Sequence, residues 1–183
     1  MMDDKIQDQL TQIREQLSQL QAGSKNKLSM IVFSGELDKL IAAFNIATGA
    51  VASGIEVVLF FTFWGTSAMR DPQKKVTGKN FFSRLFGWML PRGSDKLKLS
   101  KKNFAGLGSW MIRTLMKQKN IPSLAEMIDL SGKMGVKIYV CEMSMNLMGF
   151  HREEMIDYPG LKFCGVATYL AEARESKMQL FIA

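Results

Sequence analysis

Histidine and cysteine are scarce in this chain of 183 residues, which has one histidine and two cysteines. They occur at no spacing known for zinc ligands, so we expect no metal centre. Neither a G-x-x-x-x-G-K-[ST] nor a G-x-G-x-x-G pattern is present, so the common phosphate-cradling motifs of nucleotide-binding proteins are missing. We accordingly expect no cofactor.

Long apolar runs are also missing. The longest near-apolar stretch, Val57 to Trp64, is far shorter than the roughly 20 residues that span a bilayer. Residues 1–21 are polar and lack the apolar core of a signal peptide. Two cysteines do not make a disulfide framework and are typical of a reducing compartment. We therefore expect a soluble, cytoplasmic protein.

Acidic residues are rare in the middle of the chain. The net charge is +7, but residues 70–119 contain thirteen Lys or Arg and two acids, a charge of +11, so the remainder carries −4. Such asymmetry suits an acidic partner surface, an anionic membrane surface or nucleic acid, and a solvated basic loop has the same composition. No recognised nucleic-acid-binding motif accompanies the charge, so we expect no nucleic-acid partner.

The chain does contain the alternation of strands and helices that is typical of α/β proteins. Short apolar runs predict buried strands at 28–33, 55–63, 136–140 and 179–183, with helical spacing between them. In the helix expected at 122–133, Ser123 and Glu126 have the spacing of a capping box. A further helix is expected at 167–176. This order predicts a three-layer α/β sandwich with a mainly parallel sheet.

The first 23 residues form a separate unit. Apolar residues spaced four, three, four and three apart mark the a and d positions of a coiled coil: Ile6, Leu10, Ile13, Leu17 and Leu20. A helix this short is marginal alone in water, so it either pairs between subunits or docks on its own domain. We favour self-association and a homo-oligomer. The chain thus divides into a heptad helix (1–23) and an α/β domain (24–183).

A long excursion interrupts the α/β domain at about 65–108. It is rich in glycine, carries most of the basic charge, and holds an aromatic segment at 81–90. Loops of this length in compact domains are usually functional. The aromatic segment fits a lid, a helix at a membrane surface, an interface anchor, or an insert packed at a subunit contact.

Cys141 is the leading candidate for chemistry because it lies where a buried strand ends and a helix begins. Ligands of α/β proteins bind at this edge of the sheet, and the N–H groups of a following helix favour the thiolate. A small buried apolar residue is the alternative. Residues with hydrogen-bonding or polarizable side chains surround it as candidate pocket residues: Glu142, Met143, Ser144 and Asn146.

Three other positions are weaker candidates. Cys164 precedes a glycine and a helix, so it is either a second working thiol or a packing residue. His151, ten residues from Cys141 across the expected helix, is more consistent with a surface histidine than with a Cys–His pair. The turn at Ser34-Gly35 precedes a helix and is a weak candidate for binding an anion.

The segment Cys141-Glu142-Met143-Ser144-Met145-Asn146-Leu147-Met148-Gly149 resembles the cysteine motif of the DsrE/DsrF-like family. It is closest to the longer branch called the second DsrE type, or labelled "peroxiredoxin family" in genomes. Three further segments support the resemblance by their order and spacing, over about 28–183: 30–39, 61–65 with Trp64, and 163–168.

The resemblance implies an α/β/α sandwich around a parallel five-stranded sheet, flavodoxin-like in outline, usually in oligomers. It also implies a cysteine that accepts sulfane sulfur as a persulfide, with TusA-like acceptors and rhodanese-like donors. Cys141 matches the sulfur-bearing position and Cys164 a second cysteine of close relatives. The matched turns place Ser34, Gly35 and Trp64 among the expected pocket residues. The heptad helix and the basic excursion have no counterpart in short family members.

Three functions therefore remain open. The first is a sulfur carrier or sulfurtransferase that loads sulfur on Cys141 and passes it to an acceptor thiol. The second is a thiol redox protein that uses a Cys141–Cys164 disulfide. The third is a non-catalytic oligomeric or membrane-surface assembly module built on the heptad helix and the basic aromatic segment.

Overall fold

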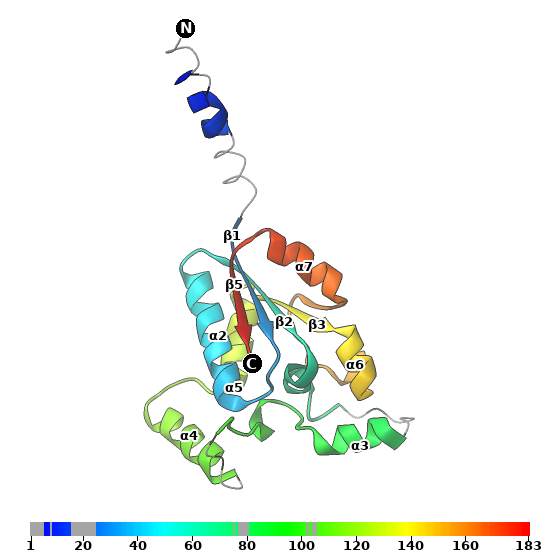
Figure 1. Cartoon of the computed structure of the whole chain (residues 1–183). Helices are drawn as coiled ribbons and strands as arrows, with labels where there is room; N and C mark the ends of the chain where they lie inside the picture. Colours follow the sequence, from blue (N-terminus) through cyan, green and yellow to red (C-terminus); the bar gives the residue numbers. More distant parts are fainter. Residues whose placement is uncertain are drawn as a thin grey trace.

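A five-stranded parallel sheet forms the centre of the molecule. The computed structural model describes residues 6–7, 9–15, 25–74, 76, 81–101, 103 and 106–183, without the side chains of 25 and 81–84. The strand order is β4-β3-β2-β1-β5 (Figure 1), and all neighbours are parallel. The strands are β1 (Lys25–Val32), β2 (Glu56–Phe61), β3 (Lys137–Cys141), β4 (Leu161–Cys164) and β5 (Ser176–Ile182). The expected fold class is thus confirmed.

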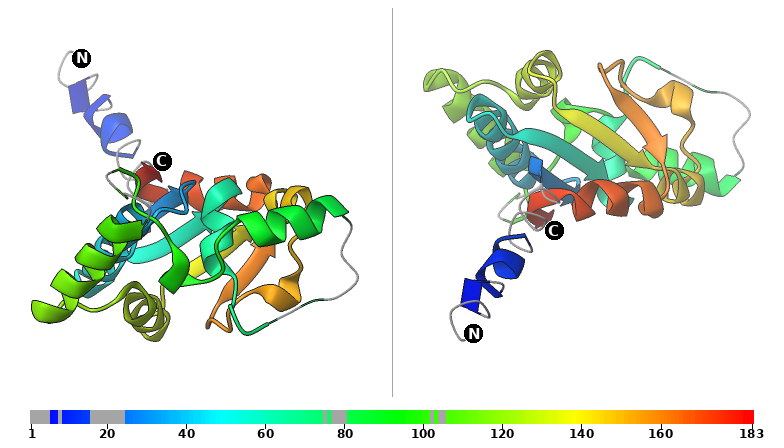
Figure 2. Two further views of the ribbon diagram at one scale, coloured as in Figure 1. Left: turned by 90° about the horizontal axis from the view of Figure 1, so that it is seen from below. Right: turned by 90° about the horizontal axis from the view of Figure 1, so that it is seen from above.

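Helices cover both faces of the sheet. The α-helices of the domain are α2 (Leu37–Ala52), α3 (Phe81–Met89), α4 (Leu107–Gln118), α5 (Leu124–Lys133), α6 (Glu142–Met148) and α7 (Val166–Arg174). Figure 2 shows α5 and α7 on opposite sides of the sheet. Helix α2 packs beside α5 on the same face. The capping box of α5 is present, with the Ser123 hydroxyl accepting from the Glu126 N–H, as the sequence predicts.

Strand β2 shows why the strands of this sheet have continuous apolar sequences rather than alternating ones. Successive side chains of a strand point to opposite faces. Leu59 and Phe61 join the larger core under α2 and α5, whereas Val58 and Phe60 join a smaller core under α7. Because both faces are covered, the buried positions of this strand, Val57 to Phe61, are all apolar, and only its first residue, Glu56, is charged.

A buried polar network positions α7 over the smaller core. Glu172 of α7 forms an ion pair with Lys27 of β1, whose side chain is only 2% exposed. The Tyr139 hydroxyl of β3 donates to the same carboxylate at 2.6 Å. Burial alone would raise the pKa of Glu172, but the bonds from Lys27 and Tyr139 hold it below its usual value. These bonds connect α7 to two strands that flank β2.

The basic excursion is fastened to the domain. It contains the 3₁₀ helices η1 (Phe63–Met69) and η2 (Ser94–Lys96) as well as α3. Arg70, fully buried, pairs with Glu154 at 3.1 Å and lies 4.3 Å over the Phe150 ring. Glu154 belongs to η4 (Arg152–Glu154), so the pair joins the start of the excursion to the segment after α6.

Apart from shifts of two or three residues at element ends, the structure differs from the sequence-based prediction at β4, at the end of β2 and at the junction of α7 with β5. The sequence predicts no strand at 161–164, but β4 forms there; it is an edge strand with only Cys164 buried, so its apolar signal is weak. Strand β2 ends at Phe61, before the expected 63, because Phe63 has a φ of 44°. The last helix ends at Arg174 and β5 begins at Ser176, whose hydroxyl donates to the Glu172 carbonyl.

The heptad segment is described in part. Residues 9–15 are helical, and Ile6, Leu10 and Ile13 are 47%, 43% and 51% exposed. This part of the seam therefore does not pack on the α/β domain. Leu17 and Leu20 lie outside the described residues, so self-association stays a prediction. Among the described residues, no helix is long and apolar enough to cross a membrane.

We predict that Gly65→Ala destabilises the domain by about 2 kcal/mol or more. A methyl group at Gly65 would overlap the Val32 carbonyl oxygen, which is backbone and cannot move aside easily. The free energy of unfolding in urea is the measurement. As a matched control, Gly49→Ala on α2 meets nothing within 4 Å and should raise stability by about 0.5–1 kcal/mol. Equal stability of the Gly65→Ala variant and the wild type would contradict the packing described.

Candidate functional site

Cys141 is the last residue of β3 and the N-cap of α6. Its φ and ψ are −70° and 112°, so the backbone is still extended when the next residue enters the helix. The residue is only 3% exposed and lies in the core under α7. The structure therefore has the strand–helix junction at Cys141, as the sequence predicts.

The groups around the Cys141 thiol have opposite effects on its pKa. Burial alone would raise the pKa of this thiol. The Ser144 hydroxyl, the Ser144 N–H, the Thr62 hydroxyl and the Met143 N–H oppose burial, and together they hold the pKa below its usual value. Because the thiolate is the reactive form of cysteine, this environment favours a nucleophilic sulfur.

Ser144 is held in place by the turn that follows β2. Its hydroxyl is fully buried, lies 2.9 Å from the Thr62 hydroxyl, and accepts from the Phe63 N–H at 3.0 Å. Phe63 adopts its positive φ at this position. A left-handed conformation costs a non-glycine residue about 1–2 kcal/mol, and such strain gathers at functional sites. The turn thus orients the hydroxyl that serves Cys141.

Cys164 lies beside Cys141 on the neighbouring strand. The two residues are paired in the parallel register of β3 and β4, and both side chains belong to the core under α7. Neighbouring strands are about 4.8 Å apart, within the Cα separation of about 4.4–6.8 Å that disulfides span. Both thiols are free in the structure.

The two thiols differ in acidity. Burial raises the pKa of Cys164, and the neighbouring charges of Cys141 and Glu142 raise it further, against a smaller opposing effect of Lys162. The pKa of Cys141 is shifted in the opposite direction. At neutral pH Cys141 is therefore the better nucleophile of the pair, and Cys164 is the better-protonated partner.

The other candidates beside Cys141 have side chains at or near the surface, and Met143 affects the thiol only through its backbone N–H. Glu142 pairs with Arg152 at the surface, and the Met143 and Asn146 side chains are exposed. His151 is exposed as well, as the sequence suggests. No group of three or more His, Cys, Asp or Glu side chains in the described part of the chain could hold a metal ion.

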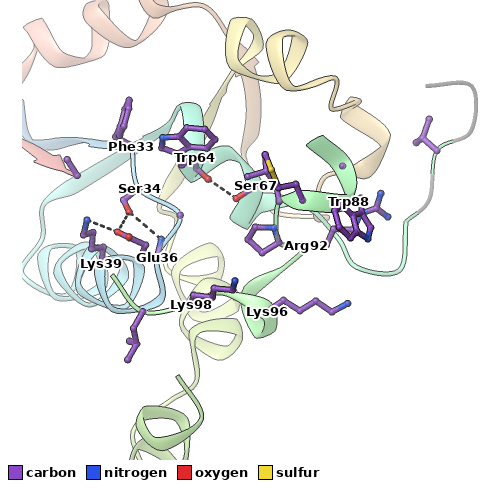
Figure 3. A pocket seen from close by; sticks show the side chains of 18 residues that line it. Phe33, Ser34, Glu36, Lys39, Trp64, Ser67, Trp88, Arg92, Lys96 and Lys98 are labelled. Carbon is purple, nitrogen blue, oxygen red and sulfur yellow. Dashed lines mark hydrogen bonds and ion pairs between the residues drawn. The ribbon is translucent and has the colours of Figure 1, made fainter. Parts of the chain in front are cut away.

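Ser34, Gly35 and Trp64 lie in a separate cavity, of about 1330 Å³, which Cys141 and residues 142–146 do not line (Figure 3). Gly35 is needed there for packing, since a Cβ at this position would lie 2.5 Å from the Trp64 carbonyl oxygen. The Ser34 hydroxyl donates to Glu36 at 2.7 Å, and Glu36 pairs with Lys39 at 2.6 Å. The structure thus separates a thiol site from a cavity, where the sequence suggests one pocket.

Sequence reasoning missed two contributors. Thr62 belongs to a segment that matches the family, but no local signal shows that its hydroxyl faces a cysteine 79 positions later. Arg92, Lys96 and Lys98 belong to the basic excursion, and their placement around the cavity depends on how the excursion folds back. For Thr62, the one usable signal in the sequence is its position directly after a buried strand, at the edge of the sheet where ligands bind.

The parallel sheet and the cysteine at its carboxyl edge define a class of small α/β proteins, and comparison gives the family. The model of the DsrE/DsrF/DrsH-like family matches residues 24–181, so the chain belongs to this family. The expected family is confirmed.

Two individual proteins and one solved structure are similar to this chain. YrkE of Bacillus subtilis, an uncharacterised protein, is 43% identical over 156 residues, which are 85% of this chain and 96% of YrkE. The sulfur carrier protein DsrE2 of Allochromatium vinosum is 32% identical over 163 residues, 86% of this chain and 99% of its own. The crystal structure of the YchN protein from E. coli has a TM-score of 0.52 at 11% identity and covers 85% and 97% of the two chains, a likeness of fold alone.

We predict that Ser144→Ala raises the pKa of Cys141, because two of the contacts that stabilise the thiolate come from Ser144 and one is its hydroxyl. Thiolate absorbance at 240 nm, taken as the difference from Cys141→Ser, measures the titration without requiring access to the sulfur. At pH 7 the variant should show several-fold less thiolate. Ser53→Ala, an exposed serine on another helix end, should leave the curve unchanged. An unshifted curve in Ser144→Ala would show that the hydroxyl does not act on the sulfur.

Proposed function

We propose that this protein is a sulfur carrier that accepts sulfane sulfur as a persulfide on Cys141 and passes it to the thiol of an acceptor protein. The observation that carries the proposal is the position of Cys141, a buried thiol at the carboxyl end of β3 and the N-cap of α6, next to the Ser144 hydroxyl that Thr62 and the Phe63 N–H hold in place. A sulfur-trafficking role is also supported by membership of the DsrE/DsrF/DrsH-like family and by the similarity to a sulfur carrier protein of Allochromatium vinosum.

The chemistry is two thiol exchanges. In loading, the Cys141 thiolate attacks the outer sulfur of a donor persulfide, a new S–S bond forms to Cys141, and the donor leaves as its thiolate. In unloading, the thiolate of the acceptor attacks the outer sulfur of the Cys141 persulfide and releases Cys141 as thiolate. Neither step needs an external oxidant or reductant, because the sulfane sulfur keeps its oxidation state.

The surroundings of Cys141 suit both steps. Donors that stabilise its thiolate make Cys141 a good nucleophile in loading and a good leaving group in unloading. Burial protects a bound persulfide from water and small oxidants. In this proposal the donors are rhodanese-like proteins and the acceptors TusA-like proteins, as the family resemblance implies, and acceptors with acidic surfaces would match the basic excursion.

Intact-mass spectrometry after incubation with a sulfane-sulfur donor tests the proposal. Wild type and Cys164→Ser should gain one sulfur, and Cys141→Ser should not. Cys164→Ser is the matched control because Cys164 is the partner of Cys141 in the strand register. Normal loading of Cys141→Ser would overturn the proposal. Loading of wild type that no thiol acceptor can discharge would overturn the carrier role.

A thiol redox function is the second candidate, and the register of Cys141 and Cys164 favours it. In this function the Cys164 thiolate attacks the Cys141 sulfur of a persulfide, a Cys141–Cys164 disulfide forms, and the outer sulfur leaves as hydrosulfide. The two cysteines are oxidised and the sulfane sulfur is reduced. A cellular dithiol then restores the pair.

Mild oxidation with a diazene-type thiol oxidant should distinguish this function. We predict an intramolecular disulfide, seen as the loss of two hydrogens from the intact mass and reversed by a dithiol. The single variants Cys141→Ser and Cys164→Ser should each retain one reactive thiol and form no intramolecular bond. If oxidation of wild type yields only linked dimers or no disulfide, the redox function is excluded while sulfur loading stands.

A further inference from the structure

The cavity lined by Ser34, Gly35 and Trp64 lies at the topological switch point of the sheet. From β1 the chain reaches β2 through α2 on one face, whereas β5, the other neighbour of β1, is reached through α7 on the opposite face. Ligands of open α/β sheets bind in the crevice at such a point, beyond the carboxyl ends of the strands. Phe33, Ser34 and Ala183, which follow β1 and β5, line the cavity.

Basic side chains dominate this crevice. Among the described residues, Lys39, Arg92, Lys96 and Lys98 line it together with one acidic residue, Glu36. Glu36 pairs with Lys39, and Arg92 lies 3.7 Å from Glu154. Lys96 and Lys98 are exposed and have no ion-pair partner among the described residues. An excess of positive charge in a concave site attracts anions and concentrates them there.

The basic rim is held by backbone contacts. The Leu37 N–H donates to the Lys98 carbonyl at 2.8 Å, and Ser100 donates to the Asp38 carboxylate. Arg113 of α4 donates to the Ser94 and Leu97 carbonyls. These contacts fix the backbone of residues 94–100 against the starts of α2 and α4, so the segment that carries both lysines has a defined position.

Aromatic rings supply the second half of the site. Trp64 and Trp88 both line the cavity and are 45% and 84% exposed, so both side chains are accessible from solvent (Figure 3). Phe33, which lines the cavity, packs against the Phe63 and Phe181 rings, with centroid distances of 5.2 Å and 6.0 Å. Aromatic side chains stack on the planar bases of nucleotides, and positive side chains beside them take the phosphates.

We propose that this cavity binds a nucleotide, with its phosphates at the lysines of the rim and its base against the indoles. The volume of about 1330 Å³ exceeds the 300–1,000 Å³ that is typical of small-ligand sites, so space does not exclude a ligand of nucleotide size. The phosphates take their positive partners from side chains, and this explains how the site can exist without a glycine-rich phosphate loop.

The nucleotide site is separate from the thiol but adjoins it. Thr62 contacts the Cys141 sulfur, and Trp64, two residues later, lines the cavity. The turn after β2 therefore lies between them. Cys141 itself does not line the cavity, so binding does not depend on sulfur transfer, and the failure of either proposal leaves the other intact.

Isothermal titration of the full chain with ADP at low salt tests the proposal. Wild type and Cys141→Ser should bind ADP alike. We expect Lys96→Gln/Lys98→Gln to weaken binding about ten-fold or more, because charge-assisted bonds to phosphate are lost. The matched control Lys119→Gln/Lys177→Gln removes the same charge from exposed positions outside the cavity and should change the affinity less than about two-fold.

Two further experiments show whether the site binds the base of the nucleotide as well as its phosphates. Trp88→Leu should weaken ADP while leaving inorganic pyrophosphate unaffected, and ADP should quench tryptophan fluorescence less in this variant. If pyrophosphate binds as tightly as ADP, the site is not for a nucleotide. If ADP does not bind, or if the two double-lysine variants weaken it equally, the proposal is wrong.

Discussion

All five strands of this sheet end at the same edge because they are all parallel, and this constraint assembles the site. The carboxyl ends of β1 to β4 carry Ser34-Gly35, Thr62 and the two cysteines, which come from positions up to 130 residues apart. In a mixed sheet, antiparallel neighbours would place some of these groups at the opposite edge. The chemistry of the molecule is therefore concentrated at one rim.

The turn after β2 connects the parts of that rim. Thr62 and the Phe63 N–H orient Ser144 and through it the Cys141 sulfur, while Trp64 and Gly65 pack against the turn after β1. The strained φ of Phe63 is tolerated because its N–H gains a buried acceptor in Ser144. Thiol acidity and the shape of the neighbouring cavity thus depend on one short segment.

Buried charges fix the elements around the rim. Arg70 and Glu154 join the basic excursion to the segment after α6, and Lys27 and Glu172 join α7 to β1. Such pairs contribute little net stability because both charges lose water, but an alternative packing would leave one of them buried alone. Their effect is to specify one arrangement of the excursion and of α7, on which the basic cavity and the thiol core depend.

Local pattern alone determined the fold class, the capping box at Ser123, the strand–helix junction at Cys141 and the family resemblance, because each depends on residues close in sequence. Strand β4 escaped prediction because an edge strand with one buried residue has little apolar periodicity. Only the tertiary structure decided that Cys164 lies opposite Cys141 in the strand register and that the Thr62 hydroxyl lowers the pKa of the Cys141 thiol. The same holds for the lysines of the excursion, which line a cavity beside β1. Those relations follow from strand order, register and long-range packing, which no single segment of the sequence encodes.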